Sequence, residues 1–294
     1  MAMKFGIHYI YWQNDFQCKS YLPYVEKAKK AGFDVLELGD YLFFDISEKD
    51  VVELKAAADY YNVELDLGLD PPAGSYLTSE DEAERNRGIA FYDKAFPRME
   101  KLGIKAIGGN MLNAPFVAPF TKNHKIAWDY AADSLRKIAD RANEYGMGIN
   151  VEIVNRYESF VVNTAAQARK LLDEVDRSNA KMTLDAFHMN VEESSFITSI
   201  LTAGEKLGHF HLEENHRGVL GTGHLPLNEI RDGLRQINYQ GILTMECLVR
   251  GGGELADGCR VWRDMTNWAE GEELDRQASD SVHAMKFLFA EGTR

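Results

Sequence analysis

Four ionisable side chains stand in apolar surroundings in the second half of this chain. They are Glu152 in GINVEIVN, Asp185 in MTLDAFH, His211 in HFHLEE and Glu246 in TMECL. Neighbouring members are 26 to 35 positions apart, close to the length of one strand, one helix and their connections. Any one of them alone is more often a strand-end residue that faces water or bonds a backbone amide. Four in register at the ends of consecutive parallel strands would instead meet at one end of a barrel.

Three carboxylates and an imidazole in one place repel each other unless a cation lies between them. Like charges a few ångströms apart raise each other's pKa, and a buried unpaired charge is costly. A divalent metal ion removes this conflict. One nitrogen and three carboxylates form an oxygen-rich ligand set, which suits Mn²⁺, Mg²⁺ or Co²⁺ better than structural Zn²⁺, although Zn²⁺ stays open. We therefore expect these four residues to hold one divalent metal ion.

Eight strand-like segments recur along the chain and could position these side chains. Short β-branched or apolar runs alternate with longer amphipathic stretches, a pattern typical of parallel strands joined by helices. The predicted strands cover residues 4–9, 34–38, 63–67, 104–108, 148–153, 181–184, 209–212 and 242–246. Eight units in 294 residues leave about 37 residues for each, which fits a (β/α)₈ TIM barrel. No Pro- or Ser-rich linker divides the sequence, so we predict one barrel domain over residues 1–294, with a doubly wound open sheet as the alternative.

Glycines and one long connection suggest where helices end and where a site is covered. Two predicted helices are followed by Gly32 and Gly146, which supply the left-handed residue that often ends a helix. The connection over 249–275 is the longest, and such segments often cover a site. Its glycines at 251–253 favour a flexible lid over a phosphate site, because the sequence has no P-loop and no GxGxxG.

The composition excludes several classes of partner. Lys and Arg number 33 against 46 Asp and Glu, so the net charge is −13, which argues against nucleic acid or an anionic membrane as partner. The three cysteines, Cys18, Cys247 and Cys259, are too scattered for a disulfide framework and form no CxxC. Neither a signal-peptide pattern nor a run of 18 apolar residues occurs. We expect a cytoplasmic protein that acts on a small molecule.

Seven segments, in order along the chain, resemble one enzyme family. They run from GIHYIYW and AGFDVLEL through VEIVNRYES, LDAFHMNVEE, GHFHLEENHRG and GTGHLP to VWRDMTNWA. The resemblance is to ketose 3-epimerases of the D-tagatose and D-psicose (D-allulose) 3-epimerase family, whose barrel is xylose isomerase-like. It implies an isomerase that forms a homo-oligomer, a dimer or a tetramer. It also implies one divalent metal ion, Mn²⁺ first with Co²⁺ or Mg²⁺ as alternatives, on residues matching Glu152, Asp185, His211 and Glu246.

The resemblance also assigns residues to the substrate. In this family, residues matching Glu158, His188 and Arg217 bind the ketose near O1, O2 and O3. Without the family, Glu158 and Arg217 would be interpreted as solvated loop charges and His188 as a loop histidine. His8, at the end of the first predicted strand, is expected to line the pocket. His209 is interpreted as a core residue or as a neighbour of the metal ligands.

The reaction that the resemblance implies is epimerisation of a free ketose at C3, of the D-fructose/D-psicose or D-tagatose/D-sorbose type, with ketopentoses as further substrates. A proton leaves the carbon beside the carbonyl and another returns on the opposite face, through a metal-stabilised cis-enediolate. Glu152 and Glu246 are the expected acid/base pair, because the fifth and eighth strands of a barrel are not neighbours. The alternatives are a sugar isomerase or inosose-type enzyme on the same barrel, and a non-catalytic sugar-binding regulator.

Four places depart from the family pattern. Cys247 and Leu248 stand where many members have Pro-Phe, and Phe16 stands where many have Trp. The loop after the third predicted strand reads GLDPPAG, and the loop after the fourth, GGNMLNAPFVAPF, lacks the usual tryptophans. These loops shape the pocket beyond the metal. We therefore expect a shifted choice of sugar with the same reaction.

Overall fold

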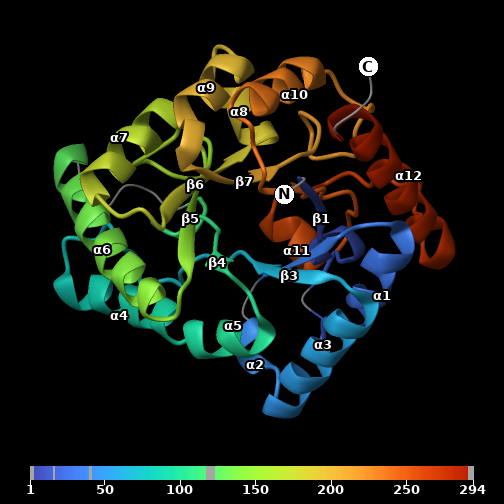
Figure 1. Ribbon diagram of the computed structural model, residues 1–294, viewed down its shortest axis with the longest axis horizontal. Coiled ribbons are helices and arrows are strands. Elements are labelled where there is room, and N and C mark those ends of the chain that lie inside the picture. Colours follow the sequence, from blue (N-terminus) through green and yellow to red (C-terminus); the bar gives the residue numbers. More distant parts are fainter. Residues whose placement is uncertain (1–2, 16, 40–41, 117–122, 291–294) are drawn as a thin grey trace.

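The computed structural model describes residues 3–15, 17–39, 42–116 and 123–290. Eight parallel strands form the inner wall of a barrel, and helices surround it (Figure 1). The strands are β1 (Lys4–His8), β2 (Val35–Leu38), β3 (Glu64–Leu67), β4 (Ala106–Ile107), β5 (Gly148–Ile153), β6 (Ala180–Asp185), β7 (Leu207–His211) and β8 (Ile242–Met245). The predicted (β/α)₈ barrel is confirmed.

The strands pair around a ring that closes between β3 and β4. The order of hydrogen-bonded strands is β3-β2-β1-β8-β7-β6-β5-β4, so the first strand lies between the second and the last. An isolated parallel bridge between Gly68 and Gly108 joins the two ends of this series, and the amide of Gly108 donates to the carbonyl of Leu67 at 2.7 Å. We call this contact the β3–β4 seam. The doubly wound open sheet is excluded, because in such a sheet the ends of the series stay unpaired.

Helices follow every strand and bury one face against the barrel. They are α1 (Leu22–Ala31), α2 (Leu42–Asp45), α3 (Glu48–Tyr61), α4 (Glu82–Asp93), α5 (Phe96–Leu102), α6 (His124–Glu144), α7 (Ala165–Val175), α8 (Ala186–Glu192), α9 (Phe196–Ala203), α10 (Leu227–Gln236), α11 (Glu254–Gly258) and α12 (Gly271–Phe289). On α6 the side chains of Leu135, Ile138 and Ala142 recur at helical spacing and are buried. Ser47 and Asp50 form a capping box that begins α3.

Several element boundaries differ from the prediction by a few residues. β4 covers two of the residues in the predicted strand 104–108, because Gly108 pairs only through the bridge at the seam. Asp185 lies inside β6, whereas Glu246 directly follows β8. Gly32 and Gly146 follow α1 and α6 with φ angles of 110° and 65°, as predicted.

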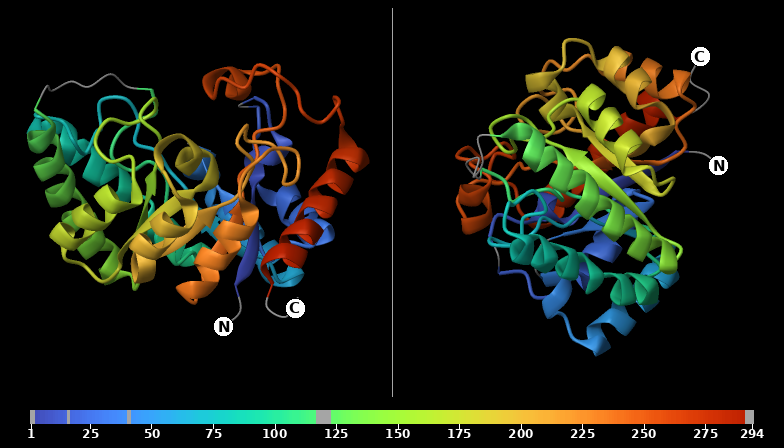
Figure 2. Two further views of the ribbon diagram at one scale, coloured as in Figure 1. Left: turned by 90° about the horizontal axis from the view of Figure 1, so that it is seen from above. Right: turned by 90° about the vertical axis from the view of Figure 1, so that its left-hand side faces the viewer.

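The long connection over 249–275 has structure of its own, since it contains α11 and the start of α12. Figure 2 shows α11 at the end of the barrel where loops follow the strands, whereas β1 begins and α12 ends at the opposite end. Among the helices that the structure describes, none is both long enough and apolar enough to cross a membrane.

Replacing Gly109 by alanine tests the β3–β4 seam. Gly109 has φ 100°, and an added Cβ would lie 2.6 Å from the carbonyl oxygen of Leu69, a backbone atom that cannot rotate away. We expect Gly109→Ala to lower the free energy of unfolding by about 2–4 kcal/mol, measured by chemical denaturation. Gly146→Ala is the matched control, because Gly146 also has positive φ but no atom lies within 4 Å of the added Cβ. Equal losses in the two variants would contradict this account of the seam.

Candidate active site

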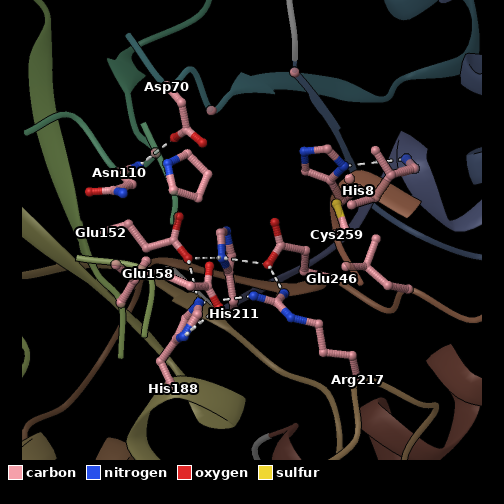
Figure 3. A pocket seen from close by; sticks show the side chains of 18 of the residues that line it. His8, Asp70, Asn110, Glu152, Glu158, His188, His211, Arg217, Glu246 and Cys259 are labelled. Atoms are coloured by element: carbon pink, nitrogen blue, oxygen red, sulfur yellow. Dashed lines mark hydrogen bonds and ion pairs between the residues drawn. The ribbon is translucent and has the colours of Figure 1, made fainter. Parts of the chain in front are cut away.

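The structure brings the four predicted metal ligands together at the carboxyl ends of β5 to β8. One ligand atom from each of Glu152, Asp185, His211 and Glu246 lies within 4.8 Å of the others. His211 Nδ1 is 3.5 Å from Glu152 Oε1, 3.8 Å from Asp185 Oδ2 and 3.4 Å from Glu246 Oε2. Asp185 pairs in register with His211, so their side chains leave neighbouring strands at the same level. Figure 3 shows Glu152, Glu246 and His211 turned toward one point.

The donor atoms at this point fit a divalent cation. Asp185 is 0% exposed and His211 is 3% exposed. Within the described part of the chain, neither Asp185 Oδ2 nor His211 Nδ1 has a hydrogen-bond partner, although both atoms are buried. Buried polar atoms without partners are rare in folded proteins and need an explanation such as an ion. Three carboxylates and one imidazole are ligands for a hard or borderline divalent metal.

A buried network behind His211 fixes which of its nitrogens faces the centre. His211 Nε2 lies 3.2 Å from Glu37 Oε1 on β2, so Nε2 donates to this carboxylate and Nδ1 is left for a ligand. Glu37 Oε2 in turn lies 3.3 Å from His209 Nε2, and His209 Nδ1 lies 2.8 Å from Asp66 Oδ2 on β3. Glu37 thus lies between His211 and His209, and Asp66 pairs with His209 on its other side.

Charge alternates along this network. Burial disfavours the charged form of His209, yet Glu37 and Asp66 on either side raise its pKa to about 9. Burial also opposes ionisation of Glu37, but His211 and His209 hold the pKa of Glu37 well below its usual range. His209 is therefore an imidazolium between two carboxylates at neutral pH. The interpretation of His209 as a core residue or a neighbour of the metal ligands agrees with this position.

Glu158, His188 and Arg217 line the same cavity as the cluster. Arg217 Nη1 donates to Glu246 Oε2 at 2.8 Å, and Arg217 Nη2 lies 2.9 Å from His188 Nε2. Asn155 donates through its side chain to Glu158 Oε1 at 3.0 Å and through its backbone amide to His188 Nδ1 at 3.2 Å. Burial raises the pKa of Glu158 and lowers the pKa of His188 to about 4. These side chains are buried or half-buried, which excludes their interpretation as solvated loop residues.

The cavity has a volume of about 440 Å³, which suits a small molecule such as one monosaccharide. His8 lines it, as predicted, and so do Leu248 and the α11 residues Leu255 and Gly258. The long connection therefore forms part of the wall. Cys247 is buried, and its thiol donates to the carbonyl of Gly218 at 3.2 Å.

The loops that depart from the family pattern contribute Asp70, Asn110 and the segment Ala114, Pro115 and Phe116 to the wall. Phe16 and residues 117–120, also named among the departures, lie outside the described residues.

Three acidic residues near the centre were not predicted from the sequence. Glu37 and Asp66 are charged residues inside the apolar strands VLEL and ELDL, and Asp70 closely follows β3 in GLDPP. A charge inside a strand that is otherwise buried is the signal that could have found the first two, since such a charge needs a partner in the barrel interior.

Comparisons with known proteins agree with this geometry. The family profile described as a xylose isomerase-like TIM barrel matches residues 25–270. A D-psicose 3-epimerase of Agrobacterium fabrum is 37% identical over 97% of this chain and 99% of its own. Two crystal structures superpose with a TM-score of 0.93 and cover 98% of this chain and 99% of their own. One is a D-psicose 3-epimerase in the presence of D-fructose, 35% identical, and the other is a D-psicose 3-epimerase with D-tagatose from Clostridium cellulolyticum H10, 36% identical. The chain belongs to the xylose isomerase-like TIM barrel family and, within it, to the ketose 3-epimerases, which are carbohydrate epimerases of the isomerase class.

Proposed function

We propose that the protein interconverts free ketoses at C3 with the help of one divalent metal ion, Mn²⁺ first and Co²⁺ or Mg²⁺ as alternatives. The observation that carries this proposal is the convergence of Glu152 and Glu246 on a buried centre with Asp185 and His211. The names of the relatives, which mention D-psicose, D-fructose, D-tagatose and L-ribulose, support a ketose as the substrate. We propose substrates of the D-fructose/D-psicose and D-tagatose/D-sorbose type, with ketopentoses beside them. We further propose that the chain acts in the cytoplasm as a homo-oligomer.

The proposed reaction needs a proton to leave C3 on one face of the sugar and another to arrive on the other. A divalent ion held by Glu152, Asp185, His211 and Glu246 would polarise the substrate carbonyl and stabilise negative charge that develops beside it. Glu152 on β5 and Glu246 after β8 come from strands that are not neighbours, so their carboxylates approach the cavity from different sides. One of them takes the C3 proton and the other delivers one, and they exchange roles in the reverse direction.

Further residues orient the sugar for this exchange. Arg217 and His188 lie beside Glu246 and present nitrogen donors to the oxygens at C1 and C2. Glu158, which accepts from Asn155, orients the C1 hydroxyl with its free oxygen. The buried cavity limits the access of water, which strengthens these charged hydrogen bonds.

A sugar isomerase or inosose-type enzyme on the same barrel would move the proton between other carbons. Chromatography of the products separates the cases, because C3 epimers of the ketose support the proposal whereas aldoses contradict it. A non-catalytic sugar-binding protein needs no pair of bases around C3, so the two glutamates favour the epimerase.

Removal of the metal tests the proposed centre. We expect chelator-treated protein to have no epimerase activity and to regain it with Mn²⁺. At free Mn²⁺ near 100 times the dissociation constant, the free energy of unfolding should rise by about 2.7 kcal/mol, measured by denaturation with and without the ion. Calorimetry should give one ion per chain. Two bound ions would contradict the interpretation of Glu37 and His209 as a hydrogen-bonding network, and the absence of binding would contradict the centre.

Substitution of the two glutamates tests the proton transfer. We expect Glu152→Gln and Glu246→Gln each to slow exchange of the C3 proton with deuterated solvent by about 100- to 10,000-fold, because an amide cannot accept the proton. NMR of the sugar measures the exchange, and the metal content of each variant is measured beside it. Glu229→Gln, on the exposed face of α10, is the control. Retained exchange in both variants would overturn the assignment.

Glu37→Gln tests the network behind His211. An amide in place of the carboxylate would turn a nitrogen donor toward either His211, which donates to Glu37, or His209, whose Nε2 lies 3.3 Å from Glu37 Oε2. We expect the dissociation constant for Mn²⁺ to rise by about 10- to 100-fold in calorimetry. Glu64→Gln is the matched control, since Glu64 begins the neighbouring strand β3 and is exposed. An unchanged dissociation constant in Glu37→Gln would show that His211 does not depend on this carboxylate.

A further inference from the structure

The cavity has two halves that lie on either side of the metal ligands. Glu158, His188 and Arg217 come from the segments after β5, β6 and β7 and form one half. His8 and Asp70 come from the ends of β1 and β3 and face the other half. Figure 3 shows Asp70 and His8 at opposite edges of the cavity, with Glu152 and Glu246 below them and Arg217 beyond.

A ketose that places C2 and C3 at the metal ligands must extend its remaining carbons into the second half. The first half is occupied by the groups that bind near O1 and O2, so C4 and the carbons after it have only the space between Asp70 and His8. This argument rests on the proposed function, because that function places C3 at the centre.

Asp70 presents one carboxylate oxygen to this space. Its Oδ1 accepts a hydrogen bond of 2.8 Å from the backbone amide of Asn110, which ties the loop after β3 to the loop after β4. Figure 3 shows the other oxygen turned toward the open cavity. The carboxylate is thus held in place by one oxygen and exposed to a ligand through the other.

His8 supplies a donor on the opposite side. Its Nδ1 accepts a hydrogen bond of 3.3 Å from the backbone amide of Ile10, so the neutral ring carries its proton on Nε2. Burial lowers the pKa of His8 and keeps the ring neutral near pH 7. In Figure 3 the nitrogen that does not bond Ile10 faces the cavity. A hydroxyl group can donate to Asp70 and accept from His8, so a polyol fits between the two side chains.

We propose that Asp70, with His8 opposite, binds the hydroxyl groups of the ketose beyond C4 and thereby selects a neutral, polyhydroxylated chain end. A phosphate or carboxylate at that end would lie near Glu152 and Glu246, and like charges in a buried site repel strongly. Burial and the charge of Glu152 raise the pKa of Asp70 to about 8, so near pH 7 its carboxyl group can both donate to and accept from hydroxyl groups. A chain end without hydroxyl groups would leave this carboxyl group without a partner, which is costly. Asp70 is thus a specificity-determining residue of a subsite for the far end of the sugar.

The test compares two ketoses that share the reacting carbons and differ in the chain end. Both have a hydroxyl on C4, but only D-fructose continues to C5 and C6 with their hydroxyls. Inversion at C3 turns erythrulose into its enantiomer, so its turnover is measured by polarimetry. We expect Asp70→Asn and Asp70→Ala to lower kcat/KM for D-fructose by about 10- to 100-fold and for erythrulose by less than about 3-fold. We also expect both the wild type and Asp70→Asn to discriminate against D-fructose 6-phosphate, because Glu152 and Glu246 are present in both. Equal losses on both ketoses would overturn the assignment.

Two controls separate recognition from structure. Asp70→Asn keeps an oxygen for the amide of Asn110, so its free energy of unfolding and its Mn²⁺ dissociation constant should match those of the wild type. Glu80→Ala removes an exposed carboxylate from the same connection between β3 and α4 and should change neither substrate ratio. A loss of stability or metal affinity in Asp70→Asn that is as large as its loss of activity would show a structural role instead.

Binding measurements keep this test independent of turnover. Calorimetric titration of the Mn²⁺-loaded protein with D-fructose and with erythrulose should show the same selective loss of affinity in Asp70→Asn. If the wild type produces no C3 epimer of either ketose but binds D-fructose through Asp70, the proposed function has failed and the subsite stands. If the wild type is active and the D-fructose to erythrulose ratio is unchanged in Asp70→Asn, the subsite has failed and the proposed function stands.

Discussion

Mutual repulsion among buried acids is the constraint on which this structure depends. Glu152, Asp185 and Glu246 converge within a few ångströms of one imidazole, and Asp185 and this imidazole are buried while the two glutamates are half-buried. In a medium of low polarity such a group of carboxylates is stable only with positive charge among them. The protein supplies part of it through Arg217, which contacts Glu246 from the side of the cavity. Among the described residues, no hydrogen-bond partner is found for Asp185 Oδ2 or His211 Nδ1, and a cation between these atoms would supply the rest.

The same requirement extends into the barrel interior. Glu37, His209 and Asp66 form a chain of alternating charge that begins at His211 and joins β2, β3 and β7. Such a network is costly when one member is removed, because its neighbours then keep a buried charge without a partner. The interior near the centre is therefore organised by hydrogen bonds between charged groups, whereas apolar packing dominates between the strands and the surrounding helices. The orientation of the His211 ring depends on this network of charged side chains.

The four proposed metal ligands could be predicted from the sequence because their positions relative to the predicted strands can be read along the chain. Glu152, Asp185, His211 and Glu246 each lie at or directly after the carboxyl end of a strand, and parallel strands of a barrel bring such ends together whatever the loops between them do. Glu37 was not predicted, since its partner lies 174 positions away and only the closure of the barrel brings the two together. Asp70 was not predicted for a similar reason. Its side chain faces the cavity because the backbone of the next loop holds it, and no pattern within either loop contains that contact. The short β4 likewise follows from how the ring closes and not from its own residues.

The β3–β4 seam lies apart from the strands that carry the proposed metal ligands. The proposed metal ligands lie on β5 to β8, which are joined by parallel ladders of hydrogen bonds, whereas Asp70, proposed to bind the far end of the sugar, lies in the loop after β3, beside the seam. Mutations in the loops beside the seam can change the choice of sugar while β5 to β8 keep their register. Related enzymes with this barrel can thus evolve to act on different sugars while they keep the same reaction.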